Sequence, residues 1–332
     1  MLDALDQIQS VLEKHRQTPI GKPFFSDPRY HAQEFNQENF KPLEGEAKHV
    51  ACVDGGNQEL FGGASASLQF VRVYANVFCG AKRTHQERHE FLCLTQSRDG
   101  AIFESTLIPL QGGLLQEEGV FRIQGDQVQD AEQRAKAAQV GALTRRFAEW
   151  ALADKILQEF DDAVVIKDGT LQTSVAKESF YAKRALARTK AEKTLCALSK
   201  TSTLLTTTGW SVTDAVQRLA PDGAWAYEWI GKSDHPDHPA DIAVAKLHPH
   251  AQRAFRVEAS QPHTQIPWKS LAENASDPGF LGYPYGLVDA DHHARVSNGE
   301  ALSWKALVYA KLGKKAEDLS KHTDAHAWLS KL

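Results

Sequence analysis

The sequence has few cysteines, no long apolar run and no excess of positive charge, and each of these absences excludes a class of protein. Its four cysteines include no Cys-x-x-Cys pair, which excludes a cysteine zinc site, and their apolar surroundings predict buried, reduced thiols rather than a disulfide framework. The longest apolar runs, such as 163–166 and 242–245, are far too short to span a bilayer. The N-terminal segment carries acids and predicts an amphipathic helix instead of a signal peptide. We therefore expect a cytoplasmic protein with no membrane contact.

The overall charge also restricts the function. The formal net charge is −4 at pH 7, and the sequence pI is about 6.4. A protein that holds nucleic acid through its overall charge is normally basic. Any nucleic-acid binding by this chain must therefore be local, or assisted by a partner.

The order of the predicted elements indicates the fold class. Strand candidates come first (49–54, 68–78, 90–94 and 101–109), followed by a helical stretch (130–160), a strand (163–168) and a long basic helix (175–199). Strands near 203–207, 224–230, 242–247 and 254–259 follow, and helices near 212–219, 268–273, 287–295 and 300–312. This order predicts an α/β fold with a mixed sheet and helices packed against it. We expect an N-terminal helix and arm (1–45), one large domain (46–312) and a polar tail (313–332).

Two predicted strands end in Asp-Gly, at Val53-Asp54-Gly55-Gly56 and at Lys167-Asp168-Gly169-Thr170. Strand ends of an α/β sheet are where sites assemble, and a glycine there lets backbone or ligand approach closely. Two carboxylates on neighbouring strands repel each other unless a cation bridges them, and oxygen ligands favour Mg²⁺ or Mn²⁺. Asp54 and Asp168 are therefore the central candidates for a metal site. The alternative is that each Asp-Gly pair only makes a turn.

Glu149 supplies a third acid. It heads an apolar stripe of the predicted helix, so we expect it to face the sheet, where a carboxylate is costly unless it is paired or bound to a metal. In the alternative reading it pairs with Arg145 or Arg146 at the rim. Asp154, on a second apolar stripe, is the substitute if the other face of the helix meets the sheet.

A dense polar segment follows Gly282-Tyr-Pro-Tyr near the C-terminus. The Tyr-Pro-Tyr-Gly run predicts an extended or turn entry that orients a helix. Five acidic, imidazole and basic side chains then share about two helical turns: Asp289, Asp291, His292, His293 and Arg295. The alternative is an exposed helix start whose acids are favoured by the helix dipole.

Taken together, Val53-Asp54-Gly55-Gly56, Glu149, the Val-Ile-Lys-Asp168 run and Gly282-Tyr283-Pro284 with the later Asp291 resemble the NurA nuclease family over roughly residues 45–310. The resemblance implies a ribonuclease H-like fold and a homodimer that cuts DNA with Mn²⁺ (or Mg²⁺). It also implies a partner, the hexameric DNA-translocating ATPase HerA, and a role in processing DNA ends for double-strand break repair.

The resemblance assigns roles to individual residues. Asp54, Glu149 and Asp168 would take the family's acidic metal positions, and Tyr283 its tyrosine before the last catalytic helix. The final position is often His in the family. Here it is Asp291, with His292 next to it, so either residue is a candidate for the last role.

The chemistry implied is two-metal hydrolysis, in which two divalent ions about 4 Å apart activate a water and stabilise the leaving oxygen. Asp54 would bridge the ions, and Glu149, Asp168 and Asp291 would complete the shells. His292 or Tyr283 would orient the phosphate or shuttle a proton near neutral pH.

Basic residues beside the acids are candidates for DNA contact, because phosphate tracking needs local positive charge. An ordinary solvated helix face is the alternative. The predicted set is Arg145, Arg146, Lys177, Lys183, Arg184 and Arg188. The histidines at 235, 238, 248 and 250 are predicted to be loop residues rather than zinc ligands, because prolines among them break helical spacing.

Two other functions remain possible. A sugar or acetate kinase also begins with a strand ending in Asp-Gly-Gly, but it needs a late Gly-Gly motif that this sequence lacks. A catalytically idle subunit for DNA binding or assembly would not need the acids that the chain retains.

Overall fold

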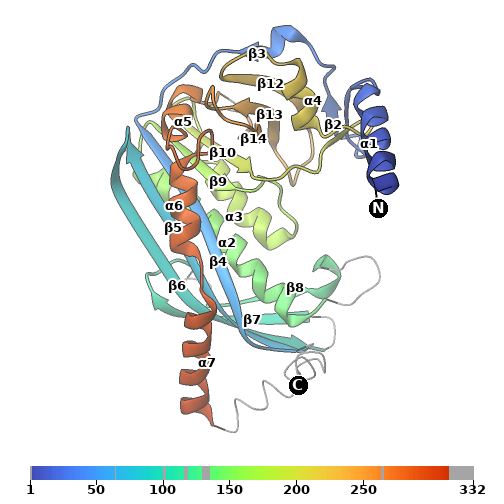
Figure 1. The fold of residues 1–332 in the computed structure, drawn as a ribbon. Helices are drawn as coiled ribbons and strands as arrows, with labels where there is room; N and C mark the ends of the chain where they lie inside the picture. Colours follow the sequence, from blue (N-terminus) through green and yellow to red (C-terminus); the bar gives the residue numbers. More distant parts are fainter. Residues whose placement is uncertain are drawn as a thin grey trace.

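Figure 1 shows the computed structural model, which describes residues 2–63, 65–99, 102–115, 119–128, 135–262 and 265–313. The predicted polar tail lies outside the described residues apart from Gly313. The strands are β1 Pro23–Phe24, β2 Tyr30–Ala32, β3 Phe40–Lys41, β4 His49–Gly62, β5 Ala66–Cys79, β6 Lys82–Arg98, β7 Ile102–Gln111, β8 Val120–Gln124, β9 Ala163–Asp168, β10 Lys193–Ser199, β11 Leu205–Thr206, β12 Trp225–Ser233, β13 Ala240–Lys246 and β14 Phe255–Ser260. The helices are α1 Leu2–Gln17, α2 Ala137–Glu159, α3 Ala176–Leu186, α4 Val212–Leu219, α5 Trp268–Asn274, α6 Tyr285–Ala294 and α7 Asn298–Leu312, with short 3-10 turns at Gln37–Asn39 and Gly125–Val128. None of these helices is long and apolar enough to cross a membrane.

One large sheet organises the chain. Its strand order is β2-β12-β13-β14-β10-β9-β4-β5-β6-β7-β8, with β3 also paired to β12. β9 is parallel to both of its neighbours, β4 and β10. On one side, β4 to β8 pair antiparallel, and on the other side the antiparallel order is β10-β14-β13-β12-β2. β9 is therefore the seam between two antiparallel halves, and the predicted mixed sheet is confirmed.

Alternate residues of β4 face two different cores, because successive side chains of a strand point to opposite faces. Ala51 and Val53 belong to the core that α2 and α3 cover. Val50 and Cys52 belong to the core that α5 and α6 cover. The same alternation holds in β9, where Val165 faces the first core and its two neighbours the second. Helices thus cover both faces of the sheet, with α6 beside β4 and β5 (Figure 1).

Three local predictions were wrong. β4 does not end at Asp54 but continues to Gly62, because β5 pairs with it along this whole length. The basic helix predicted over 175–199 ends at Leu186, and 193–199 form the buried strand β10. The strand predicted over 203–207 is only the two-residue β11. Of the cysteines, Cys52, Cys93 and Cys196 are buried as expected, but Cys79 is exposed at the end of β5.

Candidate functional site

Three predicted carboxylates meet on the α6 face of the sheet. Asp54 lies within β4 and shares the face of Cys52, Asp168 is the last residue of β9, and Asp291 lies on α6. The register pairs Val53 with Lys167, which sets Asp54 and Asp168 side by side on adjacent parallel strands. One ligand oxygen from each of the three acids lies within 4.8 Å of the others. The structure therefore forms one compact oxygen-donor group from three distant segments.

Asp54 is the acid with the least compensation. It is buried, with 6% of its surface exposed, and its Oδ1 accepts a 2.7 Å hydrogen bond from the amide of Gly55. Among the described residues no lysine, arginine or histidine forms an ion pair with it. Burial first, and then the charges of Glu149 and Asp168, raise the pKa of Asp54 to about 7. A cation bound beside this carboxylate would relieve that electrostatic cost.

The ammonium group of Lys200 already lies between the other two acids. Lys200 directly follows β10, and its Nζ is 3.0 Å from Oδ2 of Asp168 and 3.5 Å from Oδ1 of Asp291. Although burial opposes the charged form, these acids raise the pKa of Lys200. The ammonium of Lys200 occupies a point where the negative charges of Asp168 and Asp291 attract a cation.

Tyr283 and His292 lie at different depths beside these acids. The hydroxyl of Tyr283 donates to Oδ1 of Asp168 over 3.5 Å. Burial, with the charge of Asp168 as the next cause, raises the pKa of Tyr283, which keeps the phenol protonated at neutral pH. His292 is exposed and packs edge-on against His293, and it is outside the group that Asp291 joins.

Glu149 lies on the opposite face of the sheet from the three acids. It is buried on α2, its Oε2 is 2.6 Å from Nζ of Lys167, and its Oε1 pairs with Arg145. Although burial opposes ionisation, Lys167 and Arg145 lower the pKa of Glu149. Gly55 makes the approach possible, since a Cβ there would lie 2.7 Å from Oε1 of Glu149. Glu149 is thus close to Asp54 but separated from the acid group by the strand.

α6 is attached to β5 by a buried polar contact. Nδ2 of Asn76 donates to the carbonyl oxygen of Gly286 and to Oδ2 of Asp289, each at 2.8 Å. Arg83 adds an ion pair to Asp289 at 2.9 Å. Asp289 therefore holds the helix in place, and Asp291, two residues later, is the acid that α6 presents to the group.

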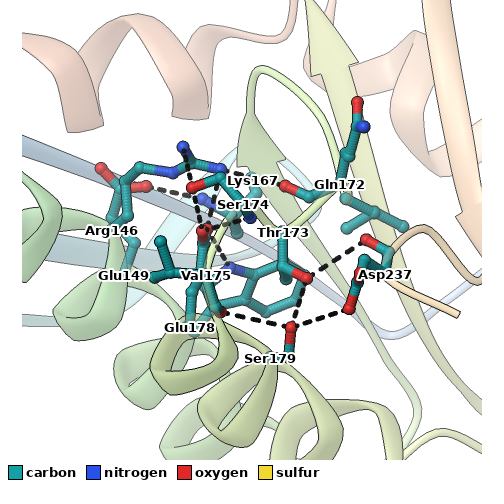
Figure 2. Close-up of polar contacts among 12 residues, drawn as sticks. Arg146, Glu149, Lys167, Gln172, Thr173, Ser174, Val175, Glu178, Ser179 and Asp237 are labelled. Carbon is teal, nitrogen blue, oxygen red and sulfur yellow. Dashed lines mark hydrogen bonds and ion pairs between the residues drawn. The ribbon is translucent and has the colours of Figure 1, made fainter. Parts of the chain in front are cut away.

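The loop after Asp168 is fixed by the polar contacts that Figure 2 shows. Arg146 donates to the carbonyl oxygen of Gln172 at 3.0 Å and pairs with Glu178 at 2.9 Å. The hydroxyl of Ser179 donates to Oδ1 of Asp237 at 3.1 Å, which ties α3 to the loop before β13. Arg146 thus supports the loop that follows Asp168.

The other residues predicted to contact DNA differ in the contacts that they already make within the chain. Arg184 and Arg188 both pair with the buried Asp154, at 3.2 and 2.9 Å. Lys177 lies over the ring of Phe180, 5.2 Å from its centre. Lys183 is exposed on α3. Asp154, the substitute for Glu149, is therefore the partner of two arginines.

A second group of possible ligands, His85, Glu87 and Glu159, lies on the α2 face. It differs from the first group in its electrostatics. Lys155 pairs with both carboxylates. Against the effect of burial, His89 and Lys155 lower the pKa of Glu87. Because Lys155 already neutralises both acids of this group, whereas Asp54 has no ion-pair partner among the described residues, the first group is the better metal candidate.

The sequence did not identify Lys167 and Lys200 as residues that pair with the candidate acids. Lys167 directly precedes Asp168, so strand alternation alone places its side chain on the face opposite that acid. The predicted helix over 175–199 hides the place of Lys200 at the end of a strand, because the prediction does not recognise the turn at Ala187–Arg188 that ends α3. The signal for it was the apolar run 194–198, which is too short for a helix and fits a buried strand.

Comparison with known proteins shows the fold. No protein-family model matches the chain, and no curated protein sequence matches it. The chain is similar to the NurA nuclease from Sulfolobus solfataricus, with a TM-score of 0.54, 12% identity, and coverage of 93% of this chain and 94% of that one. It is also similar to endonuclease V from Ciona intestinalis in complex with inosine-containing DNA (TM-score 0.38, 10% identity, 88% and 96% covered) and to endonuclease V from Bacillus subtilis (0.38, 9%, 78% and 85%). The chain thus has the fold of the NurA nuclease, which confirms the expected class of mixed sheet flanked by helices.

Proposed function

We propose that this protein is a DNA nuclease that hydrolyses phosphodiester bonds with divalent metal ions bound by Asp54, Asp168 and Asp291. The observation that carries the proposal is the convergence of these three carboxylates within 4.8 Å, with the most buried of them lacking an ion-pair partner among the described residues. The shared fold with a nuclease supports it.

The donor set suits hard divalent cations. All three donors are carboxylate oxygens, and such ligands favour Mg²⁺ and Mn²⁺ over the metals that prefer sulfur or imidazole. Metal bound there would activate a water, polarise the scissile phosphate and stabilise the leaving oxygen. We propose Mn²⁺ as the physiological ion, with Mg²⁺ as the alternative, following the family resemblance.

The chain's own groups would orient the phosphate and neutralise its charge. Tyr283 remains a hydrogen-bond donor at neutral pH because its pKa is raised. Lys200 pairs with Asp168 and Asp291, and if these acids held a cation, its ammonium would be free to pair with a phosphate oxygen. His292, exposed beside Asp291, has access to solvent and is the candidate for moving a proton to water.

We retain Glu149 in the proposal as a fourth acid because of its charge and its position. Its carboxylate lies at Gly55, directly behind Asp54, and is the second cause of the raised pKa of Asp54. Glu149 would have to leave Lys167 and Arg145 and pass β4 to reach a cation on the α6 face, so from this position it would act on the acid group through its charge.

The decisive experiment compares cleavage of linear single- and double-stranded DNA with Mn²⁺, with Mg²⁺ and with a chelator, for the unaltered protein, Asp54→Asn and Asp168→Asn. We expect metal-dependent cutting that falls at least a hundredfold in both variants, since each removes a charged ligand. Asp154→Asn is the matched control, because this buried acid pairs with arginines outside the group. Equal cutting by all proteins would contradict the proposal, and metal and DNA binding without cutting would indicate the idle subunit.

We further propose a cytoplasmic homodimer that processes DNA ends in double-strand break repair together with a HerA-type hexameric ATPase. The family resemblance motivates this, and the net charge of −4 supports a partner that delivers the DNA. Sedimentation of the purified protein tests the dimer. Cleavage assays with and without a HerA-type ATPase and ATP test the partnership, and a rate that is unchanged by the ATPase would contradict it.

A further inference from the structure

A cavity of about 420 Å³ lies beyond the carboxyl end of β9, outside the acid group. We call it the His238 cavity, and its walls include Phe25, Tyr30, Leu204, His235, His238 and Arg256. A volume of this order is that of a typical small-molecule pocket. It is large enough for one nucleotide unit.

The cavity is close to the acid group along two chain segments. Gln172 lines it and follows Asp168 by four residues, and Thr203 lines it and follows Lys200 by three. Four residues span at most about 14 Å when fully extended, a length that corresponds to about four nucleotide steps along one strand of B-form DNA. Arg256 and Glu258 flank Val257, which belongs to the core under α5 and α6, so the cavity opens on the other face of the sheet. A strand held at the acids would therefore reach it by passing over the carboxyl ends of β9 and β10.

One wall offers flat apolar surfaces. The rings of Phe25 and Tyr30 stack with centres 5.2 Å apart and planes within 8°, and Leu204 lies beside them. Aromatic faces of this kind hold unstacked bases in single-strand binding proteins with little regard to sequence.

The facing wall is polar, but its positive and negative charges neutralise each other. Glu258 is fully buried, its Oε2 is 2.7 Å from Nε2 of His238, and its other oxygen pairs with Arg256. Nδ1 of His238 is 2.8 Å from the hydroxyl of Tyr30. The buried Nε of Arg256 has no hydrogen-bond partner among the described groups. Because Glu258 offsets the guanidinium charge, this wall fits a neutral ring with donors and acceptors better than it fits a phosphate.

The polar wall is hydrogen-bonded to the loop that follows Asp168. The amide of Leu171 donates to Oε2 of Glu258 at 2.7 Å, so the segment after Asp168 is bonded to the carboxylate that also holds His238. A second cavity of about 450 Å³ is lined by Lys200 and shares Arg256 with the first. Its polar lining has three basic side chains against one acid, Asp214, and its hydroxyl and amide groups fit a sugar-phosphate backbone.

We propose that the His238 cavity binds one unstacked nucleobase of a DNA strand whose backbone lies at Asp54, Asp168 and Asp291. The stacked rings would hold the face of the base, and the wall of His238 and Arg256 would contact its polar edge. The position of the DNA strand in this inference rests on the proposed nuclease function. The binding itself requires no cleavage.

The test uses the full chain with a chelator present, so that nothing is cut. Saturation-transfer NMR compares the four deoxynucleoside monophosphates with 2-deoxyribose 5-phosphate. We expect binding of the nucleotides with the strongest transfer to base protons, and at least tenfold weaker binding of the sugar phosphate. Equal binding of the sugar phosphate, or no binding of any nucleotide, would overturn the proposal.

Variants locate the binding in the cavity. Ser26→Trp places an indole in the cavity from an exposed lining position, and Glu34→Trp, exposed and outside the lining, is the matched control. We expect nucleotide binding to fall at least tenfold in S26W and to stay unchanged in E34W. Tyr30→Phe keeps the stacked ring and removes one polar contact, so binding should persist with an altered ranking of the four bases. Loss in both tryptophan variants, or in neither, would place the base elsewhere. Unimpaired DNA cleavage by Asp54→Asn would refute the assignment of cleavage to the three acids and leave the result on nucleotide binding to stand on its own.

Discussion

At the scale of single residues, Asp54 is a carboxyl group whose ionisation is opposed by burial and by neighbouring acids. Its pKa of about 7 lies above the value of about 3.9 expected in the unfolded chain. A carboxyl with a raised pKa lowers stability as it ionises, so the cost is absent below about pH 4, grows between pH 4 and 7, and stays constant above that. At about 1.4 kcal/mol per pH unit, the upper bound is about 4 kcal/mol.

Asp54→Asn should therefore raise the free energy of unfolding of the metal-free protein at pH 8 and leave it unchanged at pH 4. Urea titrations with a chelator at the two pH values measure this. Addition of Mn²⁺ should reverse the order at pH 8, because only the carboxylate binds the ion. A variant less stable than the unaltered protein at pH 8 without metal would contradict the account.

Glu149 presents the opposite case, a buried acid that is already compensated. Glu149→Gln would leave the ammonium of Lys167 buried without its charged partner, so we expect a loss of about 3–5 kcal/mol in the free energy of unfolding. Glu149→Gln combined with Lys167→Met should recover most of the loss. If Glu149 also contacts metal, the double variant will be stable yet slow in cleavage. Recovery of both stability and cleavage would limit Glu149 to the support of β9.

At the scale of elements, the pair Gly55-Gly56 admits a helix on each face of β4. Gly55 accommodates Glu149 of α2. On the other face, a Cβ at residue 56 would lie 2.3 Å from the carbonyl oxygen of Ala294, at the end of α6. The two glycines thus set how closely both helices approach the strand that carries Asp54.

Gly56→Ala should push α6 away from β4 and weaken Mn²⁺ binding severalfold, although every acid is retained. The overpacking should also cost about 1–3 kcal/mol in the free energy of unfolding. Calorimetric titration with Mn²⁺ and urea unfolding measure the two effects. Gly299→Ala, where a Cβ would meet nothing closer than 3.9 Å, is the control. It should leave Mn²⁺ binding unchanged and should not lower the free energy of unfolding, because alanine favours the helix α7.

The same glycines show what could and could not be predicted from the sequence. Asp-Gly-Gly was expected to end a strand, because glycine is common in turns, yet here pairing with β5 continues through it. The order of strands and helices followed from the hydrophobic patterns, and Asp54, Asp168 and Asp291 were recognised from motifs. The ion pair of Glu149 with Lys167 was not predicted, because it depends on which face of β9 the lysine side chain takes. That face is known only when β4, β9 and α2 are placed together.

At the scale of the whole molecule, the negative net charge should make DNA binding weak and local. Lys183 is exposed without an ion pair in the described part of the chain, whereas Arg184 and Arg188 already neutralise Asp154. Lys183→Ala should weaken binding uniformly across DNA sequences. It should also reduce the slope of log affinity against log salt by about 1.

Fluorescence anisotropy of a labelled oligonucleotide over a salt series measures this slope, in Asp54→Asn protein so that the DNA is not cut. Lys82→Ala, an exposed lysine at the start of β6, is the control. Equal slopes for both variants would show that α3 does not track the phosphates.

The three carboxylates come from β4, β9 and α6, segments near the beginning, the middle and the end of the chain. A nascent polypeptide therefore has no complete acid group until α6 has been synthesised and has docked on the sheet. Under the proposed function, such late assembly would keep a partly made chain from attacking nucleic acid during its own translation. It also makes metal affinity a sensitive assay for whether a truncated or mutated chain has reached its native state.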